Sequence, residues 1–186
     1  MTIKTRTPRL SWSSPLVPRK TTNLIVVHHS ATLSPKSAED IHLMHQSKGW
    51  SGIGYHYYIR TDGTIEIGRP LGTVGAHCSG HNSHTVGICL EGWFDEEDGQ
   101  LPTHEQIESL LITIHYILDR YPKCKIVGHR DLMATACPGF DAGSLYREAL
   151  NNIDRMEVIT ECRNILTTAD ECKKSSEEMC MHSLDE

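Results

Sequence analysis

The chain has 186 residues, of which 38% are hydrophobic and 23% charged, and its formal net charge is −6. This composition is typical of a globular domain, and the length is sufficient to bury a substantial core. No stretch approaches the roughly 18 apolar residues of a membrane-spanning helix, so we expect no membrane span. Residues 154–186 carry nine acidic and four basic side chains, a net of −5, which leaves about −1 for the rest. This distribution argues against nucleic-acid binding, which requires a basic surface.

The beginning of the chain and its cysteines indicate the compartment. Residues 1–12 contain basic side chains but no apolar segment of the kind found in a secretory signal peptide. The seven cysteines are an odd number, in a chain long enough to fold without disulfides. We therefore expect a cytoplasmic protein without a signal peptide, in which most thiols are reduced.

The first predicted elements are an irregular arm, a strand and a helix. Residues 1–21 contain three prolines and no hydrophobic periodicity, which predicts the arm. A short apolar strand is predicted over 23–27. The helix is expected to begin after Ser37, because Ser37 and Asp40 resemble a capping box, and to end near Gly49.

The next segments have the alternation of β-strands. Residues 55–60 and 65–68 flank a turn at 61–64, which predicts a β-hairpin. Residues 86–90 alternate large apolar side chains with others, which predicts a strand with one buried face.

The second half of the chain is predicted to be mainly helical. Thr103 and Gln106 form a capping-box pattern, and the apolar residues that follow fall on one face of a helix up to Arg120. A short strand over 125–127 and a helix over 142–153 come next.

The last part of the chain has weaker helical patterns. Residues 158–166 show amphipathic spacing, and 168–171 resemble the start of a further short helix. Because strands and helices are mixed, and several connections are too long for hairpins, we expect an α/β (α+β) fold with a mixed central β-sheet flanked by helices. The expected organisation is the irregular arm at 1–21, one domain at 22–153 and an acidic helical tail at 154–186.

Two apolar strands are followed by side chains that bind metals. His28 ends the first strand, His129 follows the strand at 125–127, and Cys137 comes eight residues later. A histidine–cysteine pair alone is more often core packing, but the third donor suggests a site for one metal ion with a fourth position left for water. Imidazole and thiolate are the donors that zinc prefers. The neighbouring His29 points to the other side of its strand and is interpreted as a structural residue or as one that supports the metal ligands.

Four segments in the same order resemble the type-2 N-acetylmuramoyl-L-alanine amidases: IVVHHSAT, GWSGIGYHYYIRTDGTIEIGR, GAHCSGHNSHTVGICLEG and GHRDLMATACPGFD. That family includes small phage lysis enzymes and the catalytic domains of animal peptidoglycan-recognition proteins. The resemblance covers about residues 22–150. It implies a zinc-amidase domain that hydrolyses the amide bond between the lactyl group of muramic acid and L-alanine in peptidoglycan. It also implies one Zn²⁺ per chain, bound by His28, His129 and Cys137.

The resemblance implies further site residues. Tyr55 matches a tyrosine beside the zinc-bound water, and Thr135 stands where some phage enzymes have lysine, so it offers the oxyanion one hydroxyl and no charge. Where one branch of the family has a glutamate base, this chain has Cys89, which leaves Glu91 as a substitute. Three residues match positions that line the substrate groove, namely His45, His77 and Asn82.

Structural roles are open for several of these residues. Tyr55 could be a half-buried strand tyrosine, His45 a helix-face residue, Asn82 a turn residue and Cys137 a buried thiol. The remaining cysteines of the expected domain are interpreted as packing thiols, and the spacing of the tail cysteines is unlike that of a zinc-binding motif. These residues are Cys78, Cys89 and Cys124, and Cys162, Cys172 and Cys180.

The absence of a signal peptide and of a separate wall-binding repeat favours a phage-type endolysin that acts in host lysis. A cytoplasmic amidase that recycles soluble muropeptides would use the same chemistry. A non-catalytic peptidoglycan-binding module is disfavoured, because Tyr55 and the three expected metal ligands are all present. The acidic tail could bind a further partner, which the sequence does not identify.

Overall fold

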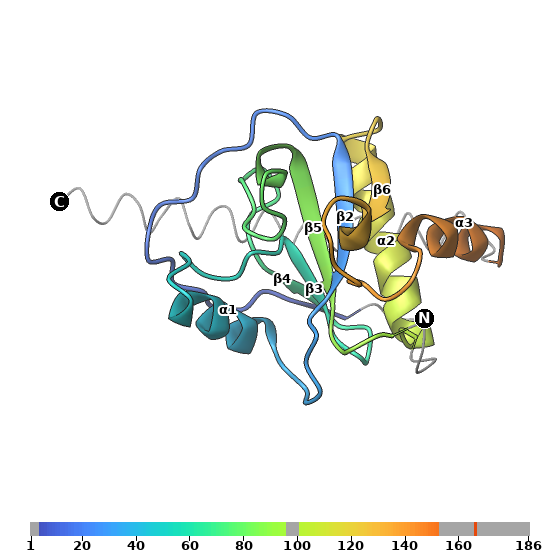
Figure 1. Ribbon diagram of the computed structural model, residues 1–186, viewed down its shortest axis with the longest axis horizontal. Helices are drawn as coiled ribbons and strands as arrows, with labels where there is room; N and C mark the ends of the chain where they lie inside the picture. Colours follow the sequence, from blue (N-terminus) through green and yellow to red (C-terminus); the bar gives the residue numbers. More distant parts are fainter. Residues whose placement is uncertain (1–3, 96–100, 153–165, 167–186) are drawn as a thin grey trace.

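The computed structural model describes residues 4–95, 101–152 and 166. Six strands form one mixed sheet in the order β1-β4-β3-β5-β2-β6 (Figure 1). Strands β3 and β4 pair antiparallel, as the predicted hairpin requires, and the other neighbouring strands pair parallel. The predicted mixed sheet with flanking helices is therefore confirmed. The strands are β1 (Thr5–Arg6), β2 (Leu24–His29), β3 (Tyr57–Ile59), β4 (Ile65–Ile67), β5 (Thr85–Leu90) and β6 (Lys125–Gly128).

Three α-helices accompany the sheet: α1 (Ala38–Ser47), α2 (His104–Arg120) and α3 (Ala142–Asn152). Both predicted capping boxes are formed. The Ser37 hydroxyl accepts from the amide of Asp40, whose carboxylate accepts from the amide of Ser37 in return. Thr103 and Gln106 make the same exchange at the start of α2. These contacts satisfy amides that the first helical turn leaves without partners.

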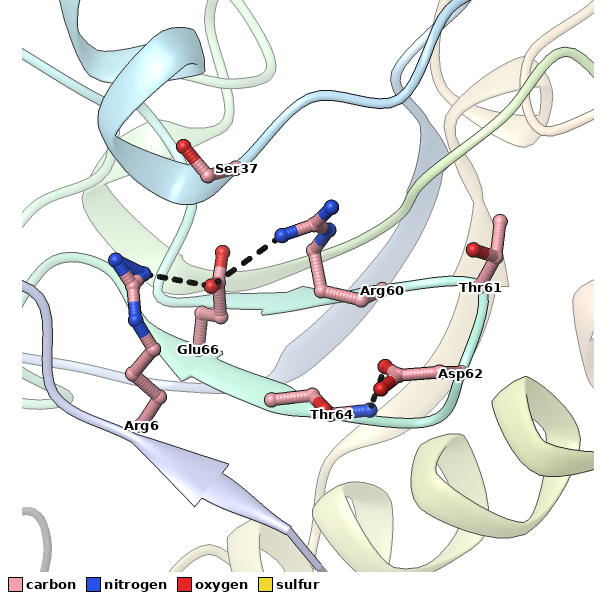
Figure 2. Close-up of a pocket in the computed structure, with 7 residues that line it drawn as sticks. All are labelled: Arg6, Ser37, Arg60, Thr61, Asp62, Thr64 and Glu66. Atoms are coloured by element: carbon pink, nitrogen blue, oxygen red, sulfur yellow. Dashed lines mark hydrogen bonds and ion pairs between the residues drawn. The ribbon is translucent and has the colours of Figure 1, made fainter.

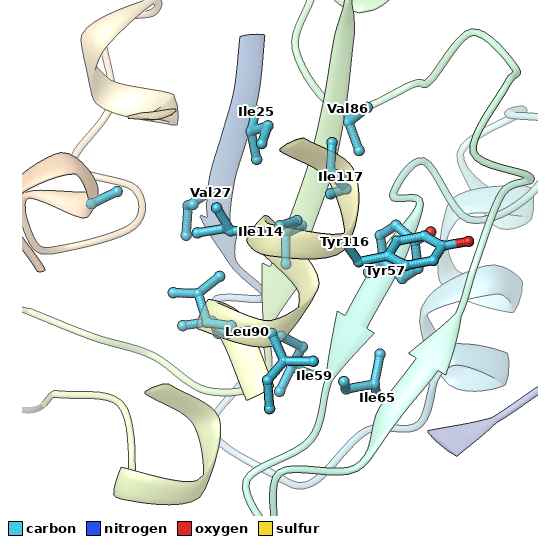
Figure 3. Packing of buried hydrophobic residues seen from close by; sticks show 14 of the residues in the cluster. Ile25, Val27, Tyr57, Ile59, Ile65, Val86, Leu90, Ile114, Tyr116 and Ile117 are labelled. Carbon is cyan, nitrogen blue, oxygen red and sulfur yellow. The ribbon is translucent and has the colours of Figure 1, made fainter. Parts of the chain in front are cut away.

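The two faces of the sheet are covered by different helices. Ile25 and Val27 of β2 point to one face, where Ile114 and Ile117 of α2 pack on them in the large core cluster (Figure 3). Side chains alternate along a strand, so His28 points to the opposite face. Helix α1 contributes to a smaller core cluster on that face, which places α1 on the same side of the sheet as His28. That cluster comprises Ala38, Ile41, Ile53, Tyr58 and Cys89.

The structure differs from the sequence-based expectation in two elements. The arm at 1–21 is not irregular throughout, because β1 pairs with β4 and extends the sheet at its edge. Strand β5 is buried on both faces rather than one. Its face toward α1 carries Gly87 and Cys89, whose small side chains do not produce the pattern of large apolar residues that marks a core face.

The expected helices beyond residue 153 lie outside the described residues, with one exception. Leu166, at the end of the predicted segment 158–166, is helical and fully buried in the large core cluster. Among the described residues, no helix is long and apolar enough to cross a membrane.

Candidate metal centre

The parallel strands β2 and β6 bring the expected metal ligands to one edge of the sheet. Strand β2 pairs in parallel with β6, so their carboxyl ends lie side by side. His28 stands near the end of β2, and β6 leads directly into the 3-10 helix η2 (His129–Asp131). The loop after η2 then returns, and its closure is fixed by a 2.7 Å hydrogen bond from the amide of Arg130 to the carbonyl of Cys137.

The ligand atoms of His28, His129 and Cys137 all lie within 4.8 Å of one another. The Sγ atom of Cys137 is 3.9 Å from Nδ1 of His28, and the rings of His28 and His129 are 4.5 Å apart between centroids. His28 is 1% exposed and Cys137 is 8% exposed. The sulfur also accepts a 3.3 Å hydrogen bond from the amide of His29. The structure thus brings together the three residues that the sequence suggested as ligands.

The electrostatics of this cluster fit a divalent cation. Burial, followed by the nearby His77 and His129, keeps the pKa of His28 well below its ordinary value, and burial also lowers the pKa of His129. Both rings are therefore neutral at pH 7, with a lone pair available for a metal. Burial raises the pKa of the Cys137 thiol to about 11, so a thiolate at this position needs an adjacent positive charge. Two neutral imidazoles and one thiolate would leave a tetrahedral ion one open position.

Tyr55 lies beside the candidate ligands. Its ring is 5.2 Å from that of His28 and 5.6 Å from that of His45, between centroids. It packs against the small core cluster that contains Cys89. Burial, followed by the two thiols Cys89 and Cys137, raises the pKa of Tyr55 well above its ordinary value. The phenol therefore keeps its proton and can act as a hydrogen-bond donor.

Thr135 is exposed on the loop that carries Cys137. Its Oγ1 accepts a 3.2 Å hydrogen bond from the amide of Cys137, which leaves the hydroxyl proton available for another group. The hydroxyl thus supports the loop at a candidate ligand, and its suggested role at the oxyanion stays a prediction.

The three expected groove residues are used in different ways. His45 is next to Tyr55, and its Nδ1 accepts from the amide of Gly54 at 2.9 Å. His77 is buried behind His28, with its Nδ1 3.0 Å from Nε2 of that ring. Asn82 points inward, where its Oδ1 accepts from the amides of His77 and Cys78. His45 and His77 both lie near Tyr55, with ring centroids 5.6 and 6.4 Å from that of Tyr55. The groove roles of all three residues stay predictions.

Glu91, the suggested substitute for a carboxylate base, belongs to a different cluster. It is 2% exposed, and its carboxylate accepts from Nε of Arg60 and from the amide of Lys36. Arg60 and Arg6 also converge on the buried Glu66 in a pocket at the β1–β4 end of the sheet (Figure 2). The carboxylate of Glu91 is therefore engaged by Arg60 and Lys36, and Glu91 is not part of the candidate metal-binding group.

Two tryptophans near the site were not among the predicted site residues. Trp50 packs against His45 with ring centroids 4.5 Å apart and the ring planes inclined by 49°, and it is 39% exposed. Trp93 is 46% exposed, and its ring lies 6.2 Å from that of His29. His29 itself accepts from the amide of Phe94 at 3.1 Å, in line with the expected structural role. In the sequence, Trp50 follows a glycine where the helix ends, and nothing local to it indicates a contact with His45.

The structure is an α/β domain with a candidate metal-binding group of two histidines and one cysteine at one edge of a mixed sheet. Residues 18–140 match the sequence profile of the family described as N-acetylmuramoyl-L-alanine amidase. The chain belongs to this family.

Relatives and solved structures agree with this assignment. An endolysin of Enterobacteria phage K11 is 39% identical over 127 residues, which are 66% of this chain and 84% of the endolysin. The N-acetylmuramoyl-L-alanine amidase LysC from Clostridium intestinale superposes with a TM-score of 0.72 at 36% identity, covering 82% of this chain and 100% of LysC. A tyrosine-to-phenylalanine mutant of Drosophila PGRP-LB, solved in complex with tracheal cytotoxin, has a TM-score of 0.64 at 26% identity, covering 75% and 90% of the two chains.

Proposed function

We propose that this protein is a zinc-dependent amidase that cleaves the bond between the lactyl group of muramic acid and L-alanine in peptidoglycan. The observation that carries the proposal is the convergence of His28, His129 and Cys137 within 4.8 Å, beside Tyr55, in a member of the amidase family. The stoichiometry would be one Zn²⁺ per chain. Zinc held by this group would act as a Lewis acid and lower the pKa of a bound water toward about 7.

The protein's own side chains would bind the substrate and stabilise developing charge. Tyr55 stays protonated at neutral pH and would donate a hydrogen bond to the carbonyl oxygen that becomes negative. The Thr135 hydroxyl, which accepts from the amide of Cys137, has its own proton left for the same oxygen. His45 lies beside Tyr55, and the half-exposed Trp50 lies against His45, so the two rings would provide a wall for the sugar or stem peptide.

The biological role that we propose is that of a phage-type endolysin, made in the host cytoplasm and acting on the cell wall at lysis. It is supported by the endolysin relative and its 84% coverage. The tracheal cytotoxin bound to the PGRP-LB mutant supports a peptidoglycan-related substrate.

Incubation with purified bacterial sacculi, followed by mass spectrometry of the soluble products, tests the proposal. We expect free stem peptides that begin with an unmodified L-alanine amine, and glycan strands that keep an intact lactyl carboxylate. Products cut between sugars, or tight binding to sacculi without any product, would contradict it. Cys137→Ser is the paired negative control, since it replaces the soft sulfur donor.

A further inference from the structure

A buried chain of hydrogen bonds extends from His28 away from the candidate metal position. The nitrogen that faces the other ligands is Nδ1, 3.9 Å from the sulfur of Cys137. The other ring nitrogen, Nε2, is 3.0 Å from Nδ1 of His77. On the far side of that ring, Nε2 of His77 is 3.2 Å from the hydroxyl of Thr85, and the hydroxyl donates to the carbonyl of His81 at 3.0 Å.

The carbonyl of His81, at the end of this series of hydrogen bonds, determines the direction of each of them. A carbonyl oxygen cannot donate, so the Thr85 hydroxyl gives its proton to His81 and accepts from Nε2 of His77. The proton of neutral His77 is then on Nε2, and its Nδ1 can only accept. His28 must therefore be protonated on Nε2, which leaves the lone pair of Nδ1 directed at the metal position.

The surrounding backbone is shaped to hold the His77 ring in this place. A Cβ atom on Gly87 of β5 would be 2.6 Å from Cγ of His77, and a Cβ on Gly75 would be 2.5 Å from its Cδ2. Both distances are shorter than side-chain atoms tolerate, so the ring occupies space that only glycines leave open. Asn82 fixes the other end of the residue by accepting from the amide of His77 at 2.8 Å.

We propose that His77 is a positioning residue of the metal centre, which fixes His28 in its Nε2-protonated tautomer so that Nδ1 is ready to bind the metal. This inference rests on the proposed zinc function and concerns metal binding alone. A hydrogen bond to the second nitrogen of a histidine ligand sets its tautomer and ring orientation, and its loss usually weakens metal affinity about ten- to hundredfold.

The zinc affinity of two variants of nearly equal size separates this role from simple packing. His77→Asn keeps an acceptor close to the position of Nδ1, whereas His77→Leu fills a similar volume without any polar atom. Competition with a chromophoric chelator should show a roughly ten- to hundredfold weaker zinc affinity for His77→Leu. His77→Asn should remain within a few-fold of the wild type. Equal losses in the two variants would overturn the proposal, because a packing defect would then explain both.

The tautomer of His28 can be read directly by long-range ¹H–¹⁵N NMR of the histidine rings. In the full-length zinc-free protein near pH 7.5, we expect the His28 proton on Nε2, and a mixture of tautomers in His77→Leu. A proton on Nδ1, or a mixture in the wild type, would overturn the proposal. Neither readout requires amidase activity, so a protein that meets both expectations but leaves sacculi intact would refute the proposed function alone.

Discussion

At the scale of single residues, Tyr55 is the hydroxyl-bearing side chain that lies beside the candidate metal ligand His28. Its ring contacts His28, and it packs against the small core cluster that contains Cys89. The expected position of a glutamate base is thus occupied by the fully buried thiol of Cys89. Burial, followed by the neighbouring Cys137, raises the pKa of Cys89 well above its ordinary value, so this thiol stays protonated.

Tyr55→Phe should lower the rate of peptidoglycan hydrolysis about a hundredfold or more, because one donor to the developing oxyanion is lost. The ring and its contact with His28 persist, so zinc content and the denaturation midpoint should change little. Steady-state rates on sacculi, measured beside elemental analysis of the same preparation, provide the test. A variant with full zinc and an unchanged rate would show that the hydroxyl takes no part in the reaction.

Residue types at the strand ends suggested the candidate metal ligands, since donors at the ends of two strands converge when those strands pair in parallel. The other candidate site residues came from the resemblance to the amidase family. The use of His77 could not be predicted in this way. Its partner His28 is 49 positions away, and only the folded loop reveals that its ring points inward. Glu91 shows the same limit, because its hydrogen bonds to the amides of Lys36 and Thr61 leave no pattern in the sequence.

At the scale of elements, the segments with strong periodicity were predictable and the short or unusual ones were not. Helices α1 and α2 begin at capping boxes that are visible in the sequence, and the β3–β4 hairpin surrounds a recognisable turn. Strand β1 was missed because its two residues are too few to show alternation. In β5, Gly87 replaces a large apolar side chain because the ring of His77 fills that space.

Gly87→Ala tests this interlocking of β5 with His77. Gly87 has an ordinary strand backbone, so the added methyl group should act only by displacing the ring. We expect the zinc affinity to fall about as far as in His77→Ala, roughly ten- to hundredfold. In the His77→Ala background the same change should have almost no effect, because the colliding ring is absent. The zinc affinities of the wild type, the two single variants and the double variant give the coupling energy between Gly87 and His77. Strictly additive losses of affinity would contradict the interlocking.

At the scale of the whole molecule, buried neutral histidines make stability depend on pH. Burial, followed by Lys48 and Arg69, lowers the pKa of His45 to about 4. Burial, followed by Arg19, lowers the pKa of His56 well below its ordinary value of 6.5. Between about pH 6.5 and 4 the unfolded chain binds protons that the folded chain does not. The stability linked to these groups is thus complete above pH 6.5 and is lost as the pH falls.

Urea unfolding of the zinc-free protein at pH 7 and pH 5.5 should therefore show a lower free energy of unfolding at the acidic pH. Each such histidine contributes a slope of at most about 1.4 kcal/mol per pH unit. His45→Asn keeps an acceptor for the amide of Gly54 but does not titrate, so its decrease should be smaller than that of the wild type. Identical decreases in the free energy of unfolding of the two proteins would exclude His45 as a source of the pH dependence.

The distance along the chain between the candidate ligands has a consequence for folding. His28 and Cys137 are 109 positions apart, so one ion held between them would close a loop that includes most of the domain. Such an ion binds the native arrangement and not the unfolded chain, and a free concentration a thousandfold above its dissociation constant adds about 4 kcal/mol to the free energy of unfolding. A newly made chain without zinc would therefore unfold more often and be degraded sooner. The supply of the ion would set the lifetime of the protein as well as its activity.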